Sequence, residues 1–570
     1  MPRAAILGLV MTSAAIAQPQ VQIIARTGQP APGMPNAALF TEVDRPVIAN
    51  DGTIVFRGAT NGPIGENTGL WRVAPNAAAT LVVREGAFAT ALNRFGDFGA
   101  VRFPTPPTYS LSHTGHLSFV SLLLTPESRA VSVSAWTTRT GTPQLLGRNS
   151  QAVSPASVGT ISSVQTPLST TTGYTVLLSS LSRFSPPPTS LLRDTVGGIP
   201  REVLLTAAQQ IPGGSRFYGS IQSAALNNSG TALVATFDNI SSNSTNIPTL
   251  VRVGPNAVQE VLIDGVLFTN TLPGGGRFSS ITDVALADDG SYAFTATRST
   301  TPVPPEPDTY LFASRDGQTQ VVLTRNQPIP GLRADEVVTQ WSQVQLTTSG
   351  EIFTILDIRN TQTSLTRRVA AIYRRTNWVI LAGAGDLAPG FAGGRFGEIR
   401  GTIASNGIVA ITALVLNSTG GTIGEGTWIT SPSRGLTLLM RDRLLVDVDE
   451  GPAEDFRLLR PSWFSSNELV CVEAAPINAD GTMTVVLAED NTPFFAIARI
   501  TPQSQCDSID FNRNGVFPED QDVIDFFTTL AGGTCPYVEP CDIDFNNNTV
   551  FPEDQDVIDF FATLAGDTCL

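Results

Sequence analysis

Short runs of alternating apolar and polar residues fill the chain up to about residue 500, and small polar turns separate them. The turns recur with a mean step of about 59 residues, and an apolar, β-branched run such as TIVFRGA or TALVATF follows each one. Seven of them end at Gly52, Gly115, Gly173, Gly230, Gly290, Gly350 and Gly407, and SSNE around Asn467 marks a degenerate eighth. The pattern therefore predicts eight copies of one unit, each with about four short strands.

A further apolar run keeps the same period and places one large residue at a matching position in seven units. These residues are Trp71, Trp136, Leu192, Val251, Phe312, Tyr373 and Trp428. Because they recur at one strand position, we interpret the Trp side chains as core residues.

Four-stranded meanders repeated around an axis form a β-propeller, which leaves only short sheet edges. We therefore predict a mostly β fold, with a propeller of seven or eight blades in residues 18–500. A β-solenoid is less favoured because its repeats are usually shorter, and a pair of β-sandwiches because the period continues without a break. The surplus run VQIIA at 21–25 is expected to close the ring against FFAIARI at 494–500.

Turn-strand motifs such as IANDGTIVFRG and LNNSGTALVATF accompany a proline- and glycine-rich loop, RTGQPAPG. In these motifs the body, roughly residues 21–500, resembles a group of bacterial exported proteins with tandem repeats. The resemblance implies display at the cell exterior, and it supplies no ligand.

The N-terminus predicts export. Residues 1–17 combine one Arg, an apolar run and Ala15-Ile16-Ala17, the pattern of a secretory signal peptide cleaved before Gln18. The apolar run is short for a membrane span, and no second candidate follows it. We expect a secreted protein that is attached to the cell surface by something other than a transmembrane segment.

All 35 basic residues are Arg, which excludes lysine Schiff bases and the P-loop lysine. The net charge of −15 is concentrated at the C-terminus, where residues 506–570 hold 14 acidic residues and one basic residue. No basic patch dominates, so we do not expect nucleic-acid binding.

A duplicated sequence near the C-terminus predicts a metal site. Residues 510–527 read DFNRNGVFPEDQDVIDFF, and residues 544–561 repeat 16 of these 18 residues. Asp and Asn side chains alternate ahead of an amphipathic helix, as in EF-hand loops that bind calcium. Gln521 occupies the usual twelfth position, so we assign the closing carboxylate to Asp522 and allow one extra loop residue. The predicted ligands of two calcium sites are Asp510, Asn512, Asn514, Val516, Asp520, Asp522, Asp544, Asn546, Asn548, Val550, Asp554 and Asp556.

This duplicated segment resembles dockerin modules, most closely the cysteine-flanked anchors of planctomycete-type exported proteins, over residues 506–570. The resemblance implies a small α-helical, EF-hand-like domain that binds a cohesin-like or other cell-surface protein through its paired helices. The expected partner face comprises Val523, Phe526, Phe527, Leu530, Val557, Phe560, Phe561 and Leu564.

Two departures from the loop pattern lower the expected calcium affinity. Thr549 replaces Gly515 in the second copy, and a β-branched residue resists the positive φ that Gly permits. Asn at position five in both copies lowers the ligand charge. The alternative interpretation, in which the Asp and Asn residues only cap turns, does not account for duplication of the whole pattern.

Four of the five Cys residues flank the two copies, and export makes disulfides plausible there. The pseudo-twofold packing that the dockerin resemblance implies favours Cys535–Cys541 and Cys506–Cys569, although sequence alone leaves the connectivity open. We interpret Cys471, in ELVCVEA, as a buried strand residue.

No catalytic constellation emerges. The only His residues, His113 and His116, flank a turn, and the body carboxylates are scattered over Glu42, Asp44, Asp97, Glu336, Glu398, Asp442 and Glu450. We therefore predict a non-catalytic protein whose propeller binds a glycan or protein. The alternatives are a dockerin-bearing glycoside hydrolase or lyase, whose paired carboxylates would meet in the channel, and a purely structural surface-layer component.

Overall fold

The computed structural model describes residues 20–564 except for 76, 92, 97–108, 113, 126–129, 139–140, 149–160, 165–167, 170–174, 182–188, 195–201, 207–208, 212–215, 240–245, 255–258, 265–276, 300–308, 316, 375, 432–433, 442–443, 448–455, 462–476, 490–491, 503–508, 513–518, 535–542, 544 and 546–553. It divides into two units. One runs from Val21 to Ile500, and the other contains the C-terminal segment from Thr501. The signal peptide, SSNE around Asn467, His113 and all five Cys residues lie outside the described residues.

Within the described residues of the larger unit, the strands form eight sheets. The first contains β2 (Phe40–Ile48), β3 (Ile54–Thr60), β4 (Thr68–Val73) and β5 (Thr80–Arg84). The second contains β6 (Arg94–Phe95), β7 (Tyr109–Leu111), β8 (Leu117–Leu124), β9 (Ala130–Thr137) and β10 (Gln144–Arg148). The third contains β11 (Ile161–Val164), β12 (Leu168–Ser169), β13 (Thr175–Leu181), β14 (Thr189–Asp194) and β15 (Glu202–Thr206).

The next four sheets each have four strands. The fourth contains β16 (Phe217–Leu226), β17 (Ala232–Asn239), β18 (Asn246–Val253) and β19 (Gln259–Asp264). The fifth contains β20 (Arg277–Leu286), β21 (Tyr292–Ser299), β22 (Thr309–Arg315) and β23 (Gln318–Thr324). The sixth contains β24 (Glu336–Leu346), β25 (Ile352–Asn360), β26 (Thr366–Arg374) and β27 (Asn377–Gly383). The seventh contains β28 (Arg395–Ile403), β29 (Val409–Leu416), β30 (Thr422–Ser431) and β31 (Arg434–Arg441).

The last sheet joins the two ends of the propeller sequence. It contains β32 (Leu444–Asp447), β33 (Phe456–Pro461), β34 (Met483–Glu489), β35 (Phe495–Thr501) and, paired with β35, the N-terminal strand β1 (Gln20–Arg26). Beyond the strand, Thr27 donates its N–H to the Phe495 carbonyl at 2.9 Å, and its Oγ1 accepts the Phe495 N–H at 2.9 Å. The predicted closure of the ring by residues 21–25 is confirmed.

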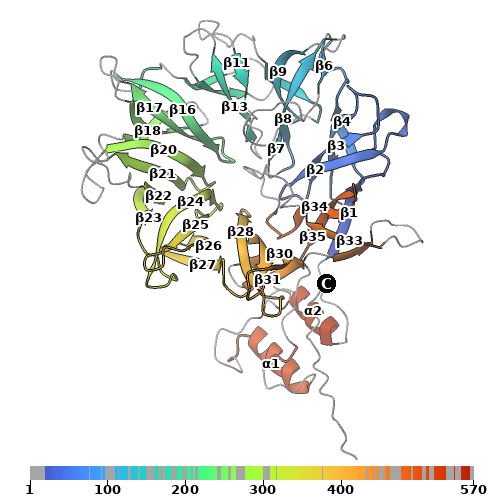
Figure 1. Cartoon of the computed structure of the whole chain (residues 1–570), viewed down its shortest axis with the longest axis vertical. Coiled ribbons are helices and arrows are strands. Elements are labelled where there is room, and N and C mark those ends of the chain that lie inside the picture. Colours follow the sequence, from blue (N-terminus) through green and yellow to red (C-terminus); the bar gives the residue numbers. More distant parts are fainter. Residues whose placement is uncertain are drawn as a thin grey trace, which may run out of the picture. The chain divides into compact units, whose positions relative to one another are not determined.

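Figure 1 shows the sheets set around a central axis, and the first strands of neighbouring sheets contact one another. The predicted mostly β fold, a propeller of mainly four-stranded sheets, is confirmed. Antiparallel neighbours follow one another in the chain, so each unit folds as a local meander.

The turn between the first and second strands is repeated in detail. In the first unit Ala49 donates its N–H to the Thr53 carbonyl, and Gly52 adopts a φ of 78°. The turn around His116 has the same hydrogen bonds, which agrees with its interpretation as a turn. In the last sheet the described turn is Asn478–Gly481, which leads into β34. The sequence analysis missed NADG because it placed the eighth turn at Asn467 instead.

The third strands carry the core. Trp71, Trp136 and Trp428 are fully or almost fully buried, as predicted. In the first unit Trp71 stacks on Phe56 at 5.9 Å and meets the edge of Phe40 at 4.8 Å, and the second unit repeats this arrangement. Each of these positions directly follows a bulge between the third and fourth strands, which recurs in the first seven sheets.

That bulge corrects one residue of the predicted repeat. In the sixth sheet the register shifts between Ala370 and Ala371, so Ala371 and not Tyr373 corresponds to Trp71. Tyr373 lies two residues after Ala371 and is the larger of the two, so a search by apolar size selected the wrong position in this unit.

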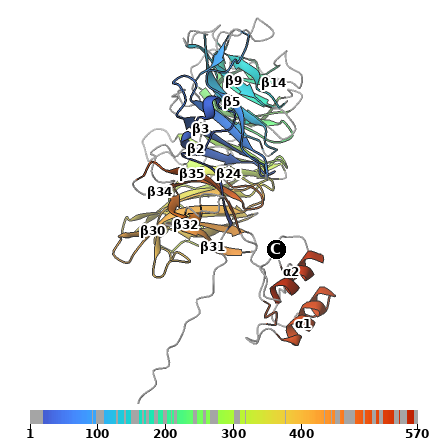
Figure 2. The same cartoon turned by 90° about the vertical axis from the view of Figure 1, so that its right-hand side faces the viewer.

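The smaller unit contains two helices, α1 (Asp520–Leu530) and α2 (Asp554–Leu564), each of 11 residues. Figures 1 and 2 both show them side by side. Each begins in the acidic part of a sequence copy, where carboxylates favour the positive end of a helix. The helices stand where the duplicated motif predicts them.

Candidate functional site

Asp522 lies in the first turn of α1 and is completely buried. Its Oδ1 accepts the Asn512 N–H at 3.4 Å, while its Oδ2 is buried and has no hydrogen-bond partner. The neighbouring Gln521 is exposed and donates its side-chain amide to Asp525. A buried carboxylate oxygen without a partner is costly, so this position suits a cation. The arrangement favours Asp522 over Gln521 as the closing residue of the loop.

Two further carboxylates meet at Asn512. The Asn512 side-chain nitrogen lies 3.2 Å from Glu519 Oε1 and 3.3 Å from Asp525 Oδ2. The sequence analysis did not select Glu519 or Asp525, although Asp525 lies one helical turn after Asp522 and therefore on the same side. Oxygen-rich surroundings of this kind suit calcium.

Asp520 departs from the predicted ligand set. It is exposed in the first turn of α1, and its counterpart Asp554 is exposed in α2. A helical residue two positions from a buried one points to a different side, which explains why Asp520 and Asp522 do not converge. Asp520 and Asp554 remain predictions, and we leave them out of the ligand sets proposed below.

The second copy repeats the burial pattern. Asp556 and Asp559, which correspond to Asp522 and Asp525, are both completely buried. The described residues contain no group of three or more His, Cys, Asp or Glu side chains that could hold a metal ion. The predicted ligands outside the described residues are Asn514, Val516, Asp544, Asn546, Asn548 and Val550, and Thr549 lies outside them too.

The two helices share an aromatic core. Phe526 of α1 stacks on Phe560 of α2 with ring centres 4.3 Å apart and an angle of 2° between the planes. Phe511 meets Phe526 edge-on at 5.3 Å, and Phe545 meets Phe560 edge-on at 5.1 Å. Equivalent residues of the two copies make equivalent contacts, so the pair has pseudo-twofold symmetry.

This core corrects the predicted partner face. Phe526 and Phe560 are completely buried against each other, and Val523, Leu530, Val557 and Leu564 pack around them. The amphipathic stripe faces the other helix because each helix buries its own apolar side first. Phe526 and Phe560 are therefore core residues, and the other four are partly buried around them.

A second apolar surface remains exposed on the helix pair. It comprises Ile524, Phe527, Ile558 and Phe561, whose exposed fractions are 55%, 37%, 51% and 43%. The rings of Phe527 and Phe561 lie 5.8 Å apart, so the contributions of the two helices meet. We call these four residues the helix-pair surface.

The two mouths of the propeller differ in chemistry. Loops that enter the first strand or join the second and third strands carry exposed apolar side chains, including Ile64, Phe88, Leu365 and Leu387. At the other mouth, short polar turns bind one another, and for example Ala479 donates its N–H to Asn50 Oδ1 at 3.1 Å. We call the mouth with the apolar loops the loop mouth, and it offers apolar contact area to a partner.

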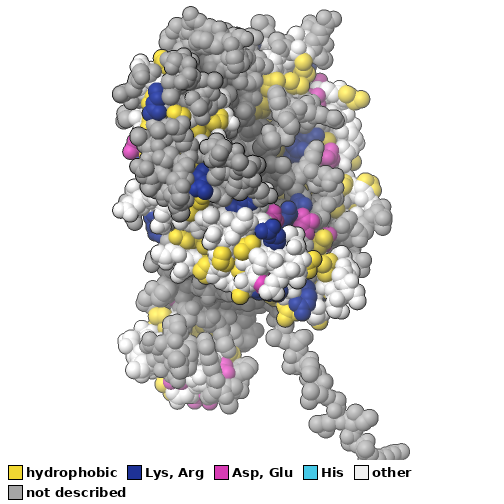
Figure 3. Space-filling model, turned by 60° about the vertical axis from the view of Figure 1, so that its left-hand side comes forward, with side chains coloured by type: hydrophobic (Ala, Val, Ile, Leu, Met, Phe, Trp, Pro, Cys, Tyr) yellow, Lys and Arg dark blue, Asp and Glu magenta, His cyan; other side chains and the backbone are white. Residues whose placement is uncertain are grey.

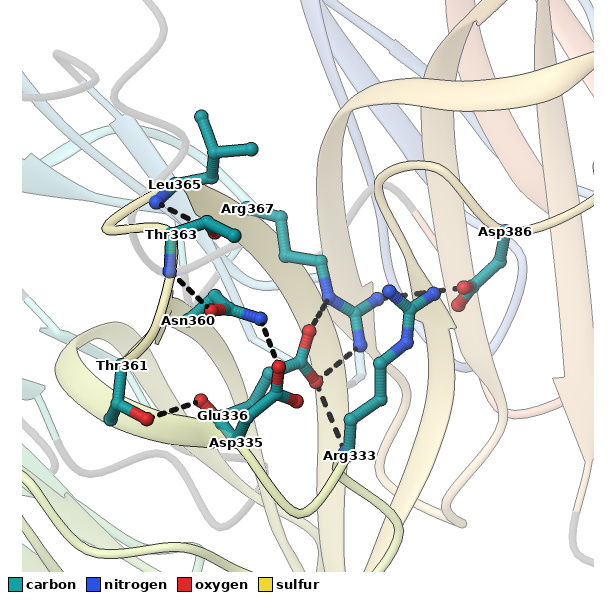
Figure 4. A network of polar contacts seen from close by, with 9 residues as sticks. All are labelled: Arg333, Asp335, Glu336, Asn360, Thr361, Thr363, Leu365, Arg367 and Asp386. Carbon is teal, nitrogen blue, oxygen red and sulfur yellow. Dashed lines mark hydrogen bonds and ion pairs between the residues drawn. The ribbon is translucent and has the colours of Figure 1, made fainter.

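Glu336 belongs to a structural network at that mouth (Figure 4). Arg367 binds both of its carboxylate oxygens, at 2.8 and 2.9 Å, and Arg333 donates its backbone N–H at 3.1 Å. Hydrogen bonds from Arg367 lower the pKa of the Glu336 carboxyl. Asn360, at the end of β25, donates its side-chain N–H to Asp335 and joins a second loop to the network. The network therefore holds two loops in place, and Glu336 is engaged by Arg367 rather than presented as a catalytic acid.

Apart from Glu42 and Asp44, the other candidate carboxylates in the described residues do not form a pair. Glu398 binds Arg368 and Arg400 at 3.3 and 3.2 Å. Asp97, Asp442 and Glu450 lie outside the described residues. Figure 3 shows Arg and acidic side chains next to one another on the face in view, with no single basic patch there. Glu42 and Asp44 are the exception, because both approach Arg57.

A family model matches residues 11–127 and 99–488, and its description is "Family of unknown function (DUF7453)". The chain belongs to this family. The matched segments cover the propeller and end before the two helices. No curated protein matches the chain.

Several solved structures match the chain at low identity. The polysaccharide lyase Uly1 is 10% identical, with a TM-score of 0.33, and the match covers 73% of this chain and 92% of the lyase. The C-terminal WD40 domain of Sif2 is 11% identical, with a TM-score of 0.31 and coverage of 84% and 97%. An α-L-arabinanase from Penicillium chrysogenum is 12% identical, with a TM-score of 0.26 and coverage of 59% and 92%.

No helix in the described part of the chain is long and apolar enough to cross a membrane.

Proposed function

We propose that this chain is an exported, non-catalytic binding protein that is held at the cell surface by its C-terminal helix pair with calcium bound. The observation that carries the proposal is the buried Asp522 carboxylate, which has an oxygen without a partner and faces Asn512. The repeated burial of Asp556 supports a second site. The propeller would be the part that binds a ligand.

The first calcium would be held by Asp510, Asn512, Asn514, the Val516 carbonyl and Asp522. The second would be held by Asp544, Asn546, Asn548, the Val550 carbonyl and Asp556. Calcium supplies a fixed double charge that offsets the repulsion among the carboxylates and ties the loop to the helix. Thr549 lowers the expected affinity of the second site.

The helix-pair surface is the proposed contact with a cohesin-like or other cell-surface protein. Phe527 and Phe561 meet across the two helices, and Ile524 and Ile558 are further exposed apolar side chains on the same helices. Exposed apolar patches rimmed by polar residues mark interaction sites in soluble proteins. The surface keeps Phe527 and Phe561 of the predicted partner face and adds Ile524 and Ile558.

We also propose that all eight sheets are blades of one ring, with β1 as the outer strand of the last. Contact between β2 and β34 supports this count, because it joins the first sheet to the last. The two ends of the propeller sequence would then pair with each other within one blade.

Surface attachment is tested with the full-length protein and the envelope of the cells that produce it. Retention in calcium, with release by a chelator, is the expected result. Phe527→Ser and Phe561→Ser together should abolish retention and leave calcium binding intact, whereas Val261→Ser, an exposed apolar position of the propeller, should change nothing. Retention that ignores both the chelator and the Phe substitutions would refute the proposed attachment.

A hydrolase or lyase with the same tail is the second candidate, and the approach of Glu42 and Asp44 to one guanidinium favours it. Paired carboxylates with separated pKa values perform glycoside hydrolysis in other proteins. Release of soluble sugar from polysaccharides by the wild-type protein, and its loss in Asp44→Asn, would establish this function in place of a non-catalytic one.

A further inference from the structure

Glu42 and Asp44 lie on β2, the first strand of the first sheet, close to the loop mouth. Residues two apart on a strand point to the same face, and Arg57 on β3 stands directly opposite Asp44. Arg57 Nη1 lies 3.1 Å from Asp44 Oδ2 and 3.8 Å from Glu42 Oε2. One guanidinium therefore holds both carboxylates together.

The backbone next to Asp44 is strained. Arg45 adopts a φ of 50°, and the pairing with β3 shifts between Asp44 and Val47. The Tyr109 hydroxyl, from the second sheet, donates to the Arg45 carbonyl, and Tyr109 is completely buried. Bulges and left-handed non-glycine residues aim side chains and concentrate at functional sites. The Arg45 side chain, 42% exposed, lies with its Nε 3.8 Å from Asp44 Oδ2.

Two other sheets contain the same bulge without the charged pair. Asp283 and Gln343 adopt φ values of 50° and 58° at the corresponding places. The residues before them, Thr282 and Ser342, pair with Thr295 and Ile355. The repeat therefore folds without an Asp–Arg pair at this position, and the pair in the first unit is an addition to the scaffold.

Asp44 has unused hydrogen-bonding capacity. Its Oδ1 is buried and has no partner, while Oδ2 binds Arg57. Burial raises the pKa of the Asp44 carboxyl, against the lowering effect of Arg57 and Arg45, and the charge of Glu42 raises it further.

The charges of the cluster decide the class of ligand. Two guanidinium groups stand beside two carboxyl groups, so neither a metal ion nor a polyanion is favoured. A sugar hydroxyl both donates and accepts, and neighbouring hydroxyls match a carboxylate acceptor beside a guanidinium donor. The side chain of Glu42 is 51% exposed and that of Asp44 24%, so a ligand at the mouth reaches Glu42 and the exposed part of Asp44 but not the buried Oδ1.

We propose that Glu42, Asp44 and Arg45 bind neighbouring hydroxyl groups of a neutral polysaccharide, with Arg57 and Tyr109 positioning them. This inference rests on the proposed function, in which the propeller is the part that binds a ligand.

The test uses the full-length protein with insoluble cellulose, xylan, chitin and curdlan, and with calcium alginate gel as the anionic comparison. Retention on at least one neutral polymer is expected, and Glu42→Gln should weaken it about tenfold or more. Asp44→Asn removes the charge that pairs with Arg57 and should also weaken retention. The matched control, Asp283→Asn, removes a charge at an equivalent bulge and should leave retention unchanged.

Several results would overturn the inference. They are the absence of retention on every neutral polymer, salt-sensitive retention on alginate alone, or equal losses in Glu42→Gln and Asp283→Asn. Unchanged melting temperatures of the variants separate loss of binding from loss of folding. Polysaccharide retention does not involve the helix pair, so it should be the same with and without a calcium chelator. Failure of the calcium-dependent attachment is thereby distinguished from failure of this site.

Discussion

Replacing Thr27 by Val is expected to loosen the N-terminal strand from the last sheet. The Thr27 hydroxyl accepts the Phe495 N–H at 2.9 Å and lies 3.0 Å from the Phe495 carbonyl. Val preserves the shape of the side chain, so the change removes hydrogen bonds without opening a cavity. Leaving a partly buried N–H without an acceptor costs about 1–3 kcal/mol. Local opening of β1 should become more frequent by roughly five- to a hundredfold, because about 1.4 kcal/mol corresponds to a factor of ten.

Hydrogen exchange of the amides in β1, followed by mass spectrometry of the intact protein, measures this opening directly. Thr27→Ser retains the hydroxyl and is the matched control, with exchange expected close to that of the wild type. Strands far from the closure, such as β21, should exchange equally in all three proteins. If β1 exchanges at the same rate in Thr27→Val and Thr27→Ser, the hydroxyl does not fasten the ring and the reasoning fails.

Two further predictions concern the Glu336 network and the helix pair. Because the pKa of Glu336 is lowered in the folded state, its contribution to stability is complete above the ordinary glutamate pKa of about 4.3 and is lost as the pH falls through the lowered value. Urea unfolding should therefore show that Glu336→Gln destabilises the propeller at pH 7 and differs less from the wild type at low pH; a difference that grows on acidification would contradict the ion pair with Arg367. Phe526→Ala removes one half of the stack with Phe560 and should cost about 3–5 kcal/mol in the stability of the helix pair, whereas Phe527→Ala should cost much less. Amide exchange in α1 and α2 measures both variants, and similar protection in the two would contradict the assigned core.

Local sequence patterns predicted much of this fold because the repeat is local. Each unit folds into its own meander, so turn glycines such as Gly52 and core residues such as Trp71 are visible in the sequence before any long-range pairing is known. The pairing of β1 with the last sheet was also predictable, because the run at residues 21–25 is surplus to the first unit. The calcium-like loop was found because two copies share nearly every residue.

Other features depend on contacts that periodicity does not encode. Which apolar side of α1 faces α2 is decided by the stacking of Phe526 on Phe560, and the sequence analysis assigned that side to a partner instead. The bulge beside Ala371 shifts the strand phase through pairing with another strand. Asp44 and Arg57 meet only because their strands are adjacent, so the scattered carboxylates of the sequence gave no sign of the cluster.

The most direct test of the central claim is a calorimetric calcium titration of the oxidised full-length protein. Two binding sites are predicted, the second weaker because of Thr549, and Asp522→Asn should remove the stronger one while Asp520→Asn, at an exposed position, leaves both. Binding to the wild type that Asp522→Asn does not alter, or no binding at all, would contradict the assignment of the helix pair as a calcium-dependent docking module.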